Sequence, residues 1–228
     1  QTHSLSRRFL DRLVDCRERD LETNQLTSVE QLQDYCEDSG SSLILLALEC
    51  LGVLHPAADH AAFHVGQAVS LCTLLRGTAF HASKERLYIP MDLMKRHGAK
   101  VKAVVNPVDA DGYPSMPEDQ QEAARDVFRE VAGMAEAHLA TAKALCAGQV
   151  PRGMEAFEGE ILSSGPMPSV AKLAFLPAVR ARLYLNDLRR LGYSHSHPSL
   201  WPMQREEDTL LRFQLRLLGA RLGVVSAF

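Results

Sequence analysis

Apolar residues recur at helical spacing along most of the chain. The clearest stripe lies within residues 118–147 and predicts a long helix with one buried face. The residues of this stripe are Ala124, Val127, Phe128, Val131, Ala135, Leu139, Ala142 and Leu145. Leu5, Phe9, Leu13 and Val14 share one face of a predicted first helix in the same way. The pattern therefore favours an all-α protein.

Capping signals divide this pattern into separate helices. Thr27 and Glu30 have the spacing of a capping box, which predicts the start of a second helix. The apolar stretch at 43–54 is too short to span a membrane and predicts a buried helix. Asp59 is a suitable N-cap for a helix that runs to about Arg76.

The rest of the chain adds helices and loops. Residues 86–90 are the only strand-like piece, and they are too few to imply a sheet. Pro177 is expected to kink the helix that contains it. The remaining predicted segments are a short helix that ends at Gly98, loops at 99–117 and 149–168, and helices at 169–191 and 205–222.

Composition fits one globular domain over residues 1–228. The chain is 46% hydrophobic and 23% charged, which suits a domain with a real core. Its net charge of −3 gives no direct signal for nucleic-acid binding. The five cysteines are scattered without zinc-binding spacing, so we expect reduced thiols. No uninterrupted apolar run is long enough to predict a transmembrane segment.

Residues 66–90 carry the most informative motif. They resemble the second signature of the squalene/phytoene synthase family, which reads roughly G-x-A-x-Q-L-T-N-I-L-R-D-V-x-E-D and then R-x-Y-x-P. The matching residues are Gly66, Ala68, Leu71, Leu75, Arg76, Arg86, Tyr88 and Pro90. Residues 35–40 and 175–198 resemble two further elements of the family. The resemblance implies a helical bundle of the isoprenoid-synthase type, of which this chain would hold the C-terminal two-thirds without the family's N-terminal helices.

In the enzymes of the family, this signature holds magnesium ions against a diphosphate leaving group. Mg²⁺ prefers carboxylate oxygens, and a D-x-x-x-D spacing places two carboxylates one helical turn apart. In this chain the first aspartate position is Gly77, the glutamate position is Phe80 and the last aspartate position is His81. The motif is therefore degenerate, and we expect no catalytic residue, no metal site and no cofactor.

Two basic residues of the motif leave a second interpretation open. Arg76 and Arg86, together with Tyr88, could still bind a diphosphate. The alternative is that the two arginines hold this segment to the bundle through carboxylates such as Glu37 or Asp38. Those two acidic residues are more simply explained by favourable charge at a helix N-terminus than as a catalytic pair.

Several other residues admit a functional and a structural interpretation. His60, His64 and His81 could approach one another as a zinc site, but hydrogen bonds between helices are the favoured role. His138 is predicted to be a core histidine with its hydrogen bonds satisfied. Trp201, the only tryptophan, is a candidate anchor for a protein partner, with packing on its own domain as the alternative.

One branch of the family resembles this chain more than the enzymes do. Residues 59–68, 75–76, 80–81 and 90–98 are similar to the complex I assembly factor 6 branch. This resemblance implies a non-catalytic protein of the mitochondrial matrix that helps to build NADH:ubiquinone oxidoreductase. Peripheral association with the inner membrane is compatible with it.

Three functional hypotheses follow. The first is a pseudoenzyme that acts in assembly or architecture of a mitochondrial complex, foremost respiratory complex I. The second is a permanent structural subunit of the mitochondrial ribosome or a respiratory complex. The third is a prenyl-diphosphate-binding protein or weak prenyl transferase. The first two hypotheses imply that the protein binds other proteins of a multi-subunit complex. One such partner could be a separate chain that supplies the family's N-terminal helices.

Overall fold

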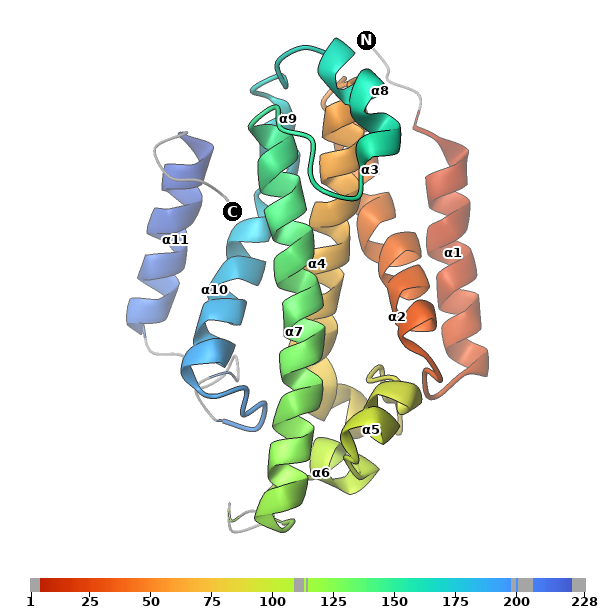
Figure 1. The fold of residues 1–228 in the computed structure, drawn as a ribbon, viewed down its shortest axis with the longest axis vertical. Coiled ribbons are helices and arrows are strands. Elements are labelled where there is room, and N and C mark those ends of the chain that lie inside the picture. Colours follow the sequence, from red (N-terminus) through yellow and green to blue (C-terminus); the bar gives the residue numbers. More distant parts are fainter. Residues whose placement is uncertain (1–4, 109–112, 114, 198–199, 201–206, 223–228) are drawn as a thin grey trace.

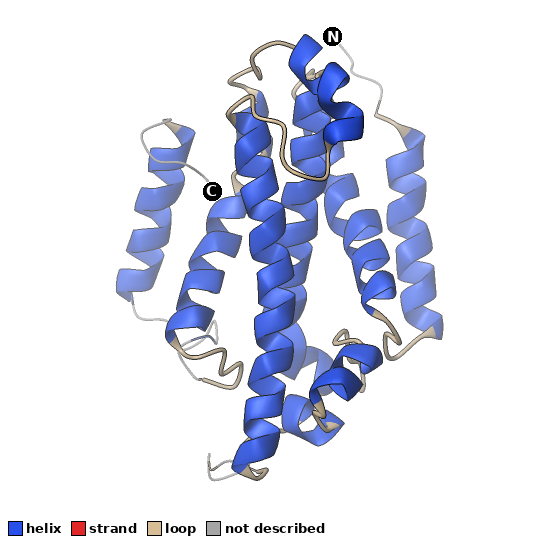
Figure 2. Cartoon of the chain, viewed as in Figure 1, coloured by secondary structure: helices blue, strands red, loops and turns tan. Residues whose placement is uncertain are grey.

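The chain folds into a bundle of α-helices, as the sequence predicts (Figures 1 and 2). The structure is a computed structural model that describes residues 5–108, 113, 115–197, 200 and 207–222. Within these residues there is no strand, and residues 86–90 contribute only an isolated bridge between Gln25 and Leu87. No helix in the described part is both long and apolar enough to cross a membrane.

Two long helices, α4 and α7, form the centre of the bundle. They pack side by side, with α1 and α2 on one side and α10 and α11 on the other (Figure 1). The α-helices are α1 (Arg7–Glu22), α2 (Val29–Cys36), α3 (Ser42–Cys50), α4 (Pro56–Ala82), α5 (Met91–His97), α6 (Val101–Val105), α7 (Glu118–Cys146), α8 (Glu158–Ser163), α9 (Ala171–Ala174), α10 (Pro177–Arg190) and α11 (Glu207–Arg221). A π-helical turn, η1 (Glu37–Ser41), joins α2 to α3, and a 3₁₀ turn, η2 (Glu155–Phe157), precedes α8.

The predicted stripe of α7 is confirmed in full. All eight of its apolar residues are buried, and they face α4 in the core. Gly148 lies just past the helix with φ of +73°, the left-handed conformation that commonly ends a helix. The predicted end of α5 at Gly98 is confirmed in the same way, with φ of +67°.

The prediction of which α1 residues form its buried face is largely wrong. Phe9 is buried, but Leu5 and Val14 are exposed, and the second buried residue is Cys16. Since α1 lies at the edge of the bundle and contacts only α3 and η1 extensively, it buries a narrow stripe of residues seven positions apart.

Several predicted helix starts shift along the chain. The N-cap of α4 is His55 rather than Asp59, because the His55 ring accepts the Ala58 N–H and Pro56 occupies the first helical position. The N-cap of α2 is Ser28 rather than Thr27, since the Ser28 hydroxyl accepts from the Gln31 N–H.

The predicted loops and the predicted kink also need correction. Residues 99–117 contain α6, and residues 149–168 contain η2 and α8. Pro177 does not kink a continuous helix. It begins α10 after the short α9, because proline lacks the N–H that the interior of a helix requires.

The backbones of α4 and η1 come into direct contact at Gly66. A Cβ atom on Gly66 would clash with the Ser41 backbone and would lie 2.6 Å from the carbonyl carbon of Gly40. The Ser41 hydroxyl donates to the Phe63 carbonyl over 2.8 Å across the same contact. The family motif residue Gly66 therefore allows close packing of α4 on η1.

Candidate functional site

The last two turns of α4 carry the degenerate motif. The helix continues to Ala82, six residues beyond the predicted end at Arg76, so Gly77, Phe80 and His81 are all helical. The chain then turns back, and Tyr88 comes to lie beside this end of the helix, with its ring centroid 4.7 Å from that of His81.

His81 occupies the space that a side chain at position 77 would need. A Cβ atom added to Gly77 would lie 2.8 Å from Nε2 of His81 and 2.9 Å from its Cδ2. The His81 ring makes edge contacts with Tyr88 and with Phe80. An aspartate at position 77 would therefore require His81 to move, so the two replacements are coupled in space.

Two tyrosines extend the cluster toward α1 and α2. The rings of Tyr35 and Tyr88 lie 5.1 Å apart. The Tyr35 hydroxyl donates to Oδ2 of Asp20 over 3.1 Å, and Arg17 contacts both this hydroxyl and, over 3.0 Å, the Asp20 carboxylate. Asp20 is therefore the acidic group in the cluster, and its charge is already matched by Arg17.

Burial sets the protonation of the cluster. It raises the pKa of Tyr35 and of Tyr88, so both hydroxyls stay protonated at neutral pH. Burial lowers the pKa of His81, while the nearby Asp20 opposes this shift. His81 is therefore uncharged at neutral pH and adds no charge where the family's magnesium-binding carboxylate would be.

A cavity of about 400 Å³ with both polar and apolar walls lies beside the two tyrosines. Its walls come from the end of α1, the segment that follows it, α2 and the segment around Leu87. Carboxylates, amides and the Arg19 guanidinium line it together with the Tyr35 and Tyr88 rings. Arg19 itself pairs with Asp38, which leaves little unmatched positive charge for a diphosphate.

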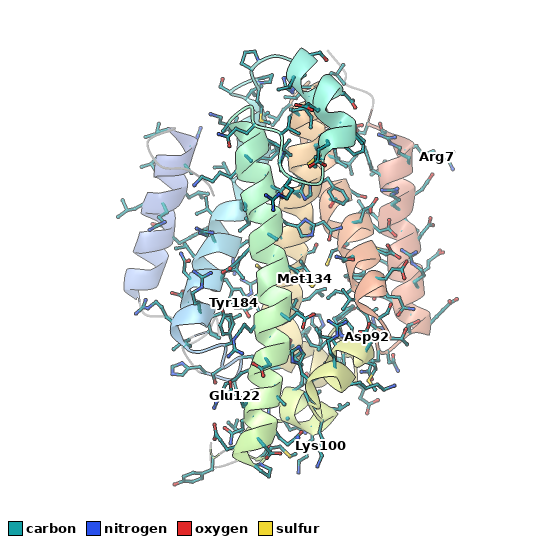
Figure 3. The ribbon with its side chains drawn as sticks, in the orientation of Figure 1. Arg7, Asp92, Lys100, Glu122, Met134 and Tyr184 are labelled. Atoms are coloured by element: carbon teal, nitrogen blue, oxygen red, sulfur yellow. The ribbon has the colours of Figure 1, made fainter. Side chains whose placement is uncertain are left out.

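The candidate diphosphate-binding residues are divided between two places. Arg86 is near Tyr88, whose pKa it lowers against the effect of burial. Arg76 instead lines a different hollow, a groove of about 460 Å³ between α4, α10 and α11. Tyr184 of α10, labelled in Figure 3, lines the same groove. The structure therefore brings Arg86 and Tyr88 together but places Arg76 elsewhere.

The carboxylates suggested as partners of Arg76 and Arg86 form ion pairs with arginines of α1. Glu37 pairs with Arg12 over 2.8 Å, and Asp38 pairs with Arg19 and, over 3.8 Å, with Arg12. Both carboxylates thus have partners on α1, because η1 packs against α1, a contact that the spacing of residues along the chain does not reveal.

The three histidines considered for zinc do not meet. His64 hydrogen-bonds to His138 of α7, with 2.8 Å between their Nδ1 atoms, whereas His60 packs against Phe157 and His81 against Tyr88. Among the described residues, no group of three or more histidine, cysteine or acidic side chains is placed to hold a metal ion. His138 has the hydrogen bond that was predicted for it, although its side chain is only half-buried.

Two site predictions had other outcomes. Trp201, the candidate partner anchor, lies outside the described residues. The cluster of Arg17, Asp20 and Tyr35 was missed, although Tyr35 belongs to a stretch that resembles the family. The i,i+3 spacing can suggest the Arg17–Asp20 pair, but it does not reveal the contact of both residues with Tyr35, which lies 15 to 18 positions away.

The coupling between positions 77 and 81 can be tested by substitution. Gly77→Asp alone is expected to lower stability by about 1–2 kcal/mol, because the His81 ring must leave its contact with Tyr88. The double variant Gly77→Asp, His81→Asp removes that clash and restores the D-x-x-x-D spacing. Since like charges one turn apart repel, Mg²⁺ should raise the melting temperature of the double variant only. An unchanged melting temperature in the single variant would contradict the clash.

Comparison with known proteins places the chain in a family. The sequence profile of squalene/phytoene synthases matches residues 1–206. The chain belongs to the squalene/phytoene synthase family. A rat relative, "NADH dehydrogenase (ubiquinone) complex I, assembly factor 6", is 32% identical over 219 residues, which are 96% of this chain and 56% of that protein. The chain therefore spans about half the length of the curated relatives it matches.

Solved structures agree on the fold. Squalene synthase HpnC from Alicyclobacillus acidocaldarius superposes with a TM-score of 0.62 at 18% identity, over 83% of this chain and 62% of that one. A dehydrosqualene synthase solved with a ligand superposes with a TM-score of 0.61 at 13% identity, over 96% of this chain and 66% of that one. The predicted isoprenoid-synthase-type bundle is thereby confirmed.

Proposed function

We propose that this chain acts without prenyl-transfer chemistry, as a factor that helps to assemble mitochondrial respiratory complex I. The observation that carries the non-catalytic part is the fit of His81 into the space next to Gly77. A lost carboxylate alone would leave a gap, whereas here an uncharged ring fills it and packs on Tyr88. The side chain at position 81 therefore contributes packing in place of a metal ligand.

The assembly part of the proposal is supported by relatives. The rat protein and a Dictyostelium discoideum homologue that is 33% identical over 191 residues are both named for assembly of complex I. As part of the same proposal, the protein acts in mitochondria, on the matrix side, with peripheral contact to the inner membrane. Its partners would be proteins of the nascent complex.

The experiment is deletion of the gene followed by native gel electrophoresis of respiratory complexes. We expect a several-fold loss of assembled complex I with other complexes preserved, and recovery when the full-length protein is restored. The protein should be absent from the mature complex, since an assembly factor leaves it. Stoichiometric retention in purified complex I would favour the permanent-subunit hypothesis instead.

A matched variant separates this function from diphosphate binding. Arg86→Ala combined with Tyr88→Phe removes the polar groups nearest to the degenerate motif and keeps the ring that packs on His81. This variant should restore complex I as well as the wild type does. Failure to restore it, with the protein present at normal levels, would contradict a non-catalytic role.

One observation favours the prenyl-diphosphate alternative. The groove between α4, α10 and α11 has mostly apolar walls, and Arg76 and Arg180 contribute guanidinium groups to it. An isoprenoid chain with an anionic head group would match this chemistry. The alternative requires saturable, Mg²⁺-dependent binding of farnesyl diphosphate to the purified protein in a calorimetric titration.

A further inference from the structure

Helix α11 has apolar residues on two faces. Phe213 and Leu217 line the groove that α11 shares with α10 and α4. Leu215, Leu218 and Leu222 follow one another at intervals of three and four residues, so they share a different face. These three side chains expose 60%, 51% and 67% of their surface. The α11 leucine stripe, as we call these three residues, is therefore left open to solvent by the described part of the bundle.

The leucine stripe lies at the side of the molecule. Helix α11 is the outermost helix beyond α10 (Figure 1). Among the described helices, α10 is the one with which α11 makes extensive contacts. Exposed apolar side chains that line up on one face of an outer helix mark a surface where another molecule binds.

The same side of the bundle is positively charged. Helices α10 and α11 together contain seven arginines and three acidic residues, although the whole chain has a net charge of −3. Arg189 pairs with Glu136 of α7, and Arg190 pairs with Asp187. Four other arginines of the two helices form no ion pair with the described residues: Arg180, Arg182, Arg216 and Arg221. This side therefore presents positive charge that the described part of the chain does not neutralise.

The charge of α11 itself is arranged around the leucine stripe. From Thr209 onward the sequence contains three arginines and no acidic residue. Arg221 lies one helical turn after Leu218 and so borders the stripe. Arg216 and Arg221 are both exposed. Leucines on one face with arginines beside them are typical of a helix that lies in the surface of a membrane.

We propose that α11 binds the surface of an anionic lipid bilayer. The leucine stripe would enter the boundary between headgroups and acyl chains, and Arg216 and Arg221 would contact lipid phosphates. The proposal rests on the proposed function in one respect, since it names the helix and the lipid chemistry of the peripheral membrane contact proposed there.

Two observations favour a bilayer over a protein partner. Positive charge is spread over α10 and α11, and attraction to a flat anionic surface adds up over all the arginines that lie near it. Helix α11 also has 15 residues, a length of about 22 Å. This is shorter than the hydrocarbon core of a bilayer, about 30 Å, so a helix with three arginines fits the surface of the bilayer.

The test measures how the purified full-length protein floats with lipid vesicles in a density gradient. Vesicles of equimolar phosphatidylcholine and phosphatidylglycerol provide the anionic surface, and vesicles of phosphatidylcholine alone provide a neutral one. We expect the protein to float with the anionic vesicles, with a partition coefficient that is roughly tenfold lower or less for the neutral vesicles. High salt should release the protein, because it screens the attraction of the arginines.

Two leucine variants locate the contact on the molecule. Leu215→Gln combined with Leu222→Gln should lower the partition coefficient for anionic vesicles roughly tenfold, because less apolar surface leaves water. The matched control is Leu21→Gln combined with Leu43→Gln, which changes exposed leucines of α1 and α3 and should leave the partition coefficient unchanged. Since all four side chains are exposed, circular dichroism should show the wild-type melting temperature for both variants.

An arginine variant tests the charge separately. Arg216→Gln combined with Arg221→Gln should lower the partition coefficient for anionic vesicles roughly tenfold, because each arginine near such a surface contributes about 1 kcal/mol. The same variant should bind neutral vesicles as the wild type does. Equal binding of the wild type to anionic and neutral vesicles would contradict the part assigned to the arginines.

Other outcomes overturn the proposal in distinct ways. If the wild type does not float, or if the leucine variant floats as well as the wild type, α11 does not bind the bilayer. If the wild type sediments as a dimer without binding vesicles, and the leucine variant sediments as a monomer, the stripe is a surface for self-association. If vesicle binding is as expected but gene deletion leaves complex I intact, the proposed function fails while membrane binding by α11 stands. If complex I is lost and no variant of α11 alters vesicle binding, only the inference about α11 fails.

Discussion

Replacing Gly66 with alanine is expected to cost about 3 kcal/mol of folding stability, a large fraction of the roughly 5–15 kcal/mol that is typical of a folded domain. The added methyl group would clash with the backbone of Ser41 rather than with a side chain that can rotate away. Helix α4 would have to move away from η1, and the 2.8 Å bond from the Ser41 hydroxyl to the Phe63 carbonyl would lengthen with it.

Gly133 of α7 provides the matched control. It is also a glycine inside a long helix, but a methyl group there would meet nothing within 4 Å. Gly133→Ala should therefore raise stability by roughly 0.5–1 kcal/mol, since alanine loses less conformational entropy on folding. Urea denaturation of both variants measures the difference. Equal effects at positions 66 and 133 would show that α4 and η1 are not in backbone contact.

Helix positions were predictable wherever burial imposes a period on the sequence. Helix α7 is the clearest case, because one of its faces meets α4 along the whole stripe. The start of α4 was missed because His55, an uncommon N-cap, provides the capping nitrogen while the better-known Asp59 lies one turn later. Competition between two local caps is decided by tertiary packing, which the sequence pattern does not contain.

The candidate site was predictable in its composition but not in its geometry. The absence of carboxylates at Gly77, Phe80 and His81 can be read directly from the sequence. The insertion of the His81 ring beside Gly77 cannot, since it depends on where Tyr88 returns after the turn. The pairing of Asp20 with Tyr35 is a contact between helices and has no periodic signal.

The fold should lose stability sharply between pH 7 and pH 5, because two half-buried histidines, His64 and His195, are held uncharged in the folded chain. Burial, together with the nearby His138 and His60, lowers the pKa of His64 to about 4. Burial also lowers the pKa of His195 to about 4, although its hydrogen bond to the Val104 carbonyl opposes the shift. The half-buried His195 ring stacks on Phe128, a core residue, with 4.1 Å between centroids.

Folding stability decreases as the pH falls because the unfolded and folded states bind protons at different pH values. In the unfolded chain these histidines take up protons near pH 6.5. In the folded chain they take up protons only near pH 4. The unfolded state therefore gains protons first as the pH falls, and folding stability decreases with it. At pH 5 the expected loss is about 2 kcal/mol for each of the two residues. Ordinary carboxylates titrate mostly below this range and add little to the slope.

His195→Phe tests the assignment. Phenylalanine keeps the stacking on Phe128 but gives up the 2.9 Å hydrogen bond to Val104, so the variant should be less stable at pH 7. It should also lose about half of the difference in unfolding free energy between pH 7 and pH 5, because one of the two main titrating groups is gone. Urea unfolding at both pH values measures this. A variant with the full wild-type pH dependence would mean that His195 is not the group that resists protonation, and that the acid sensitivity of the bundle comes from the His64–His138 contact or from elsewhere.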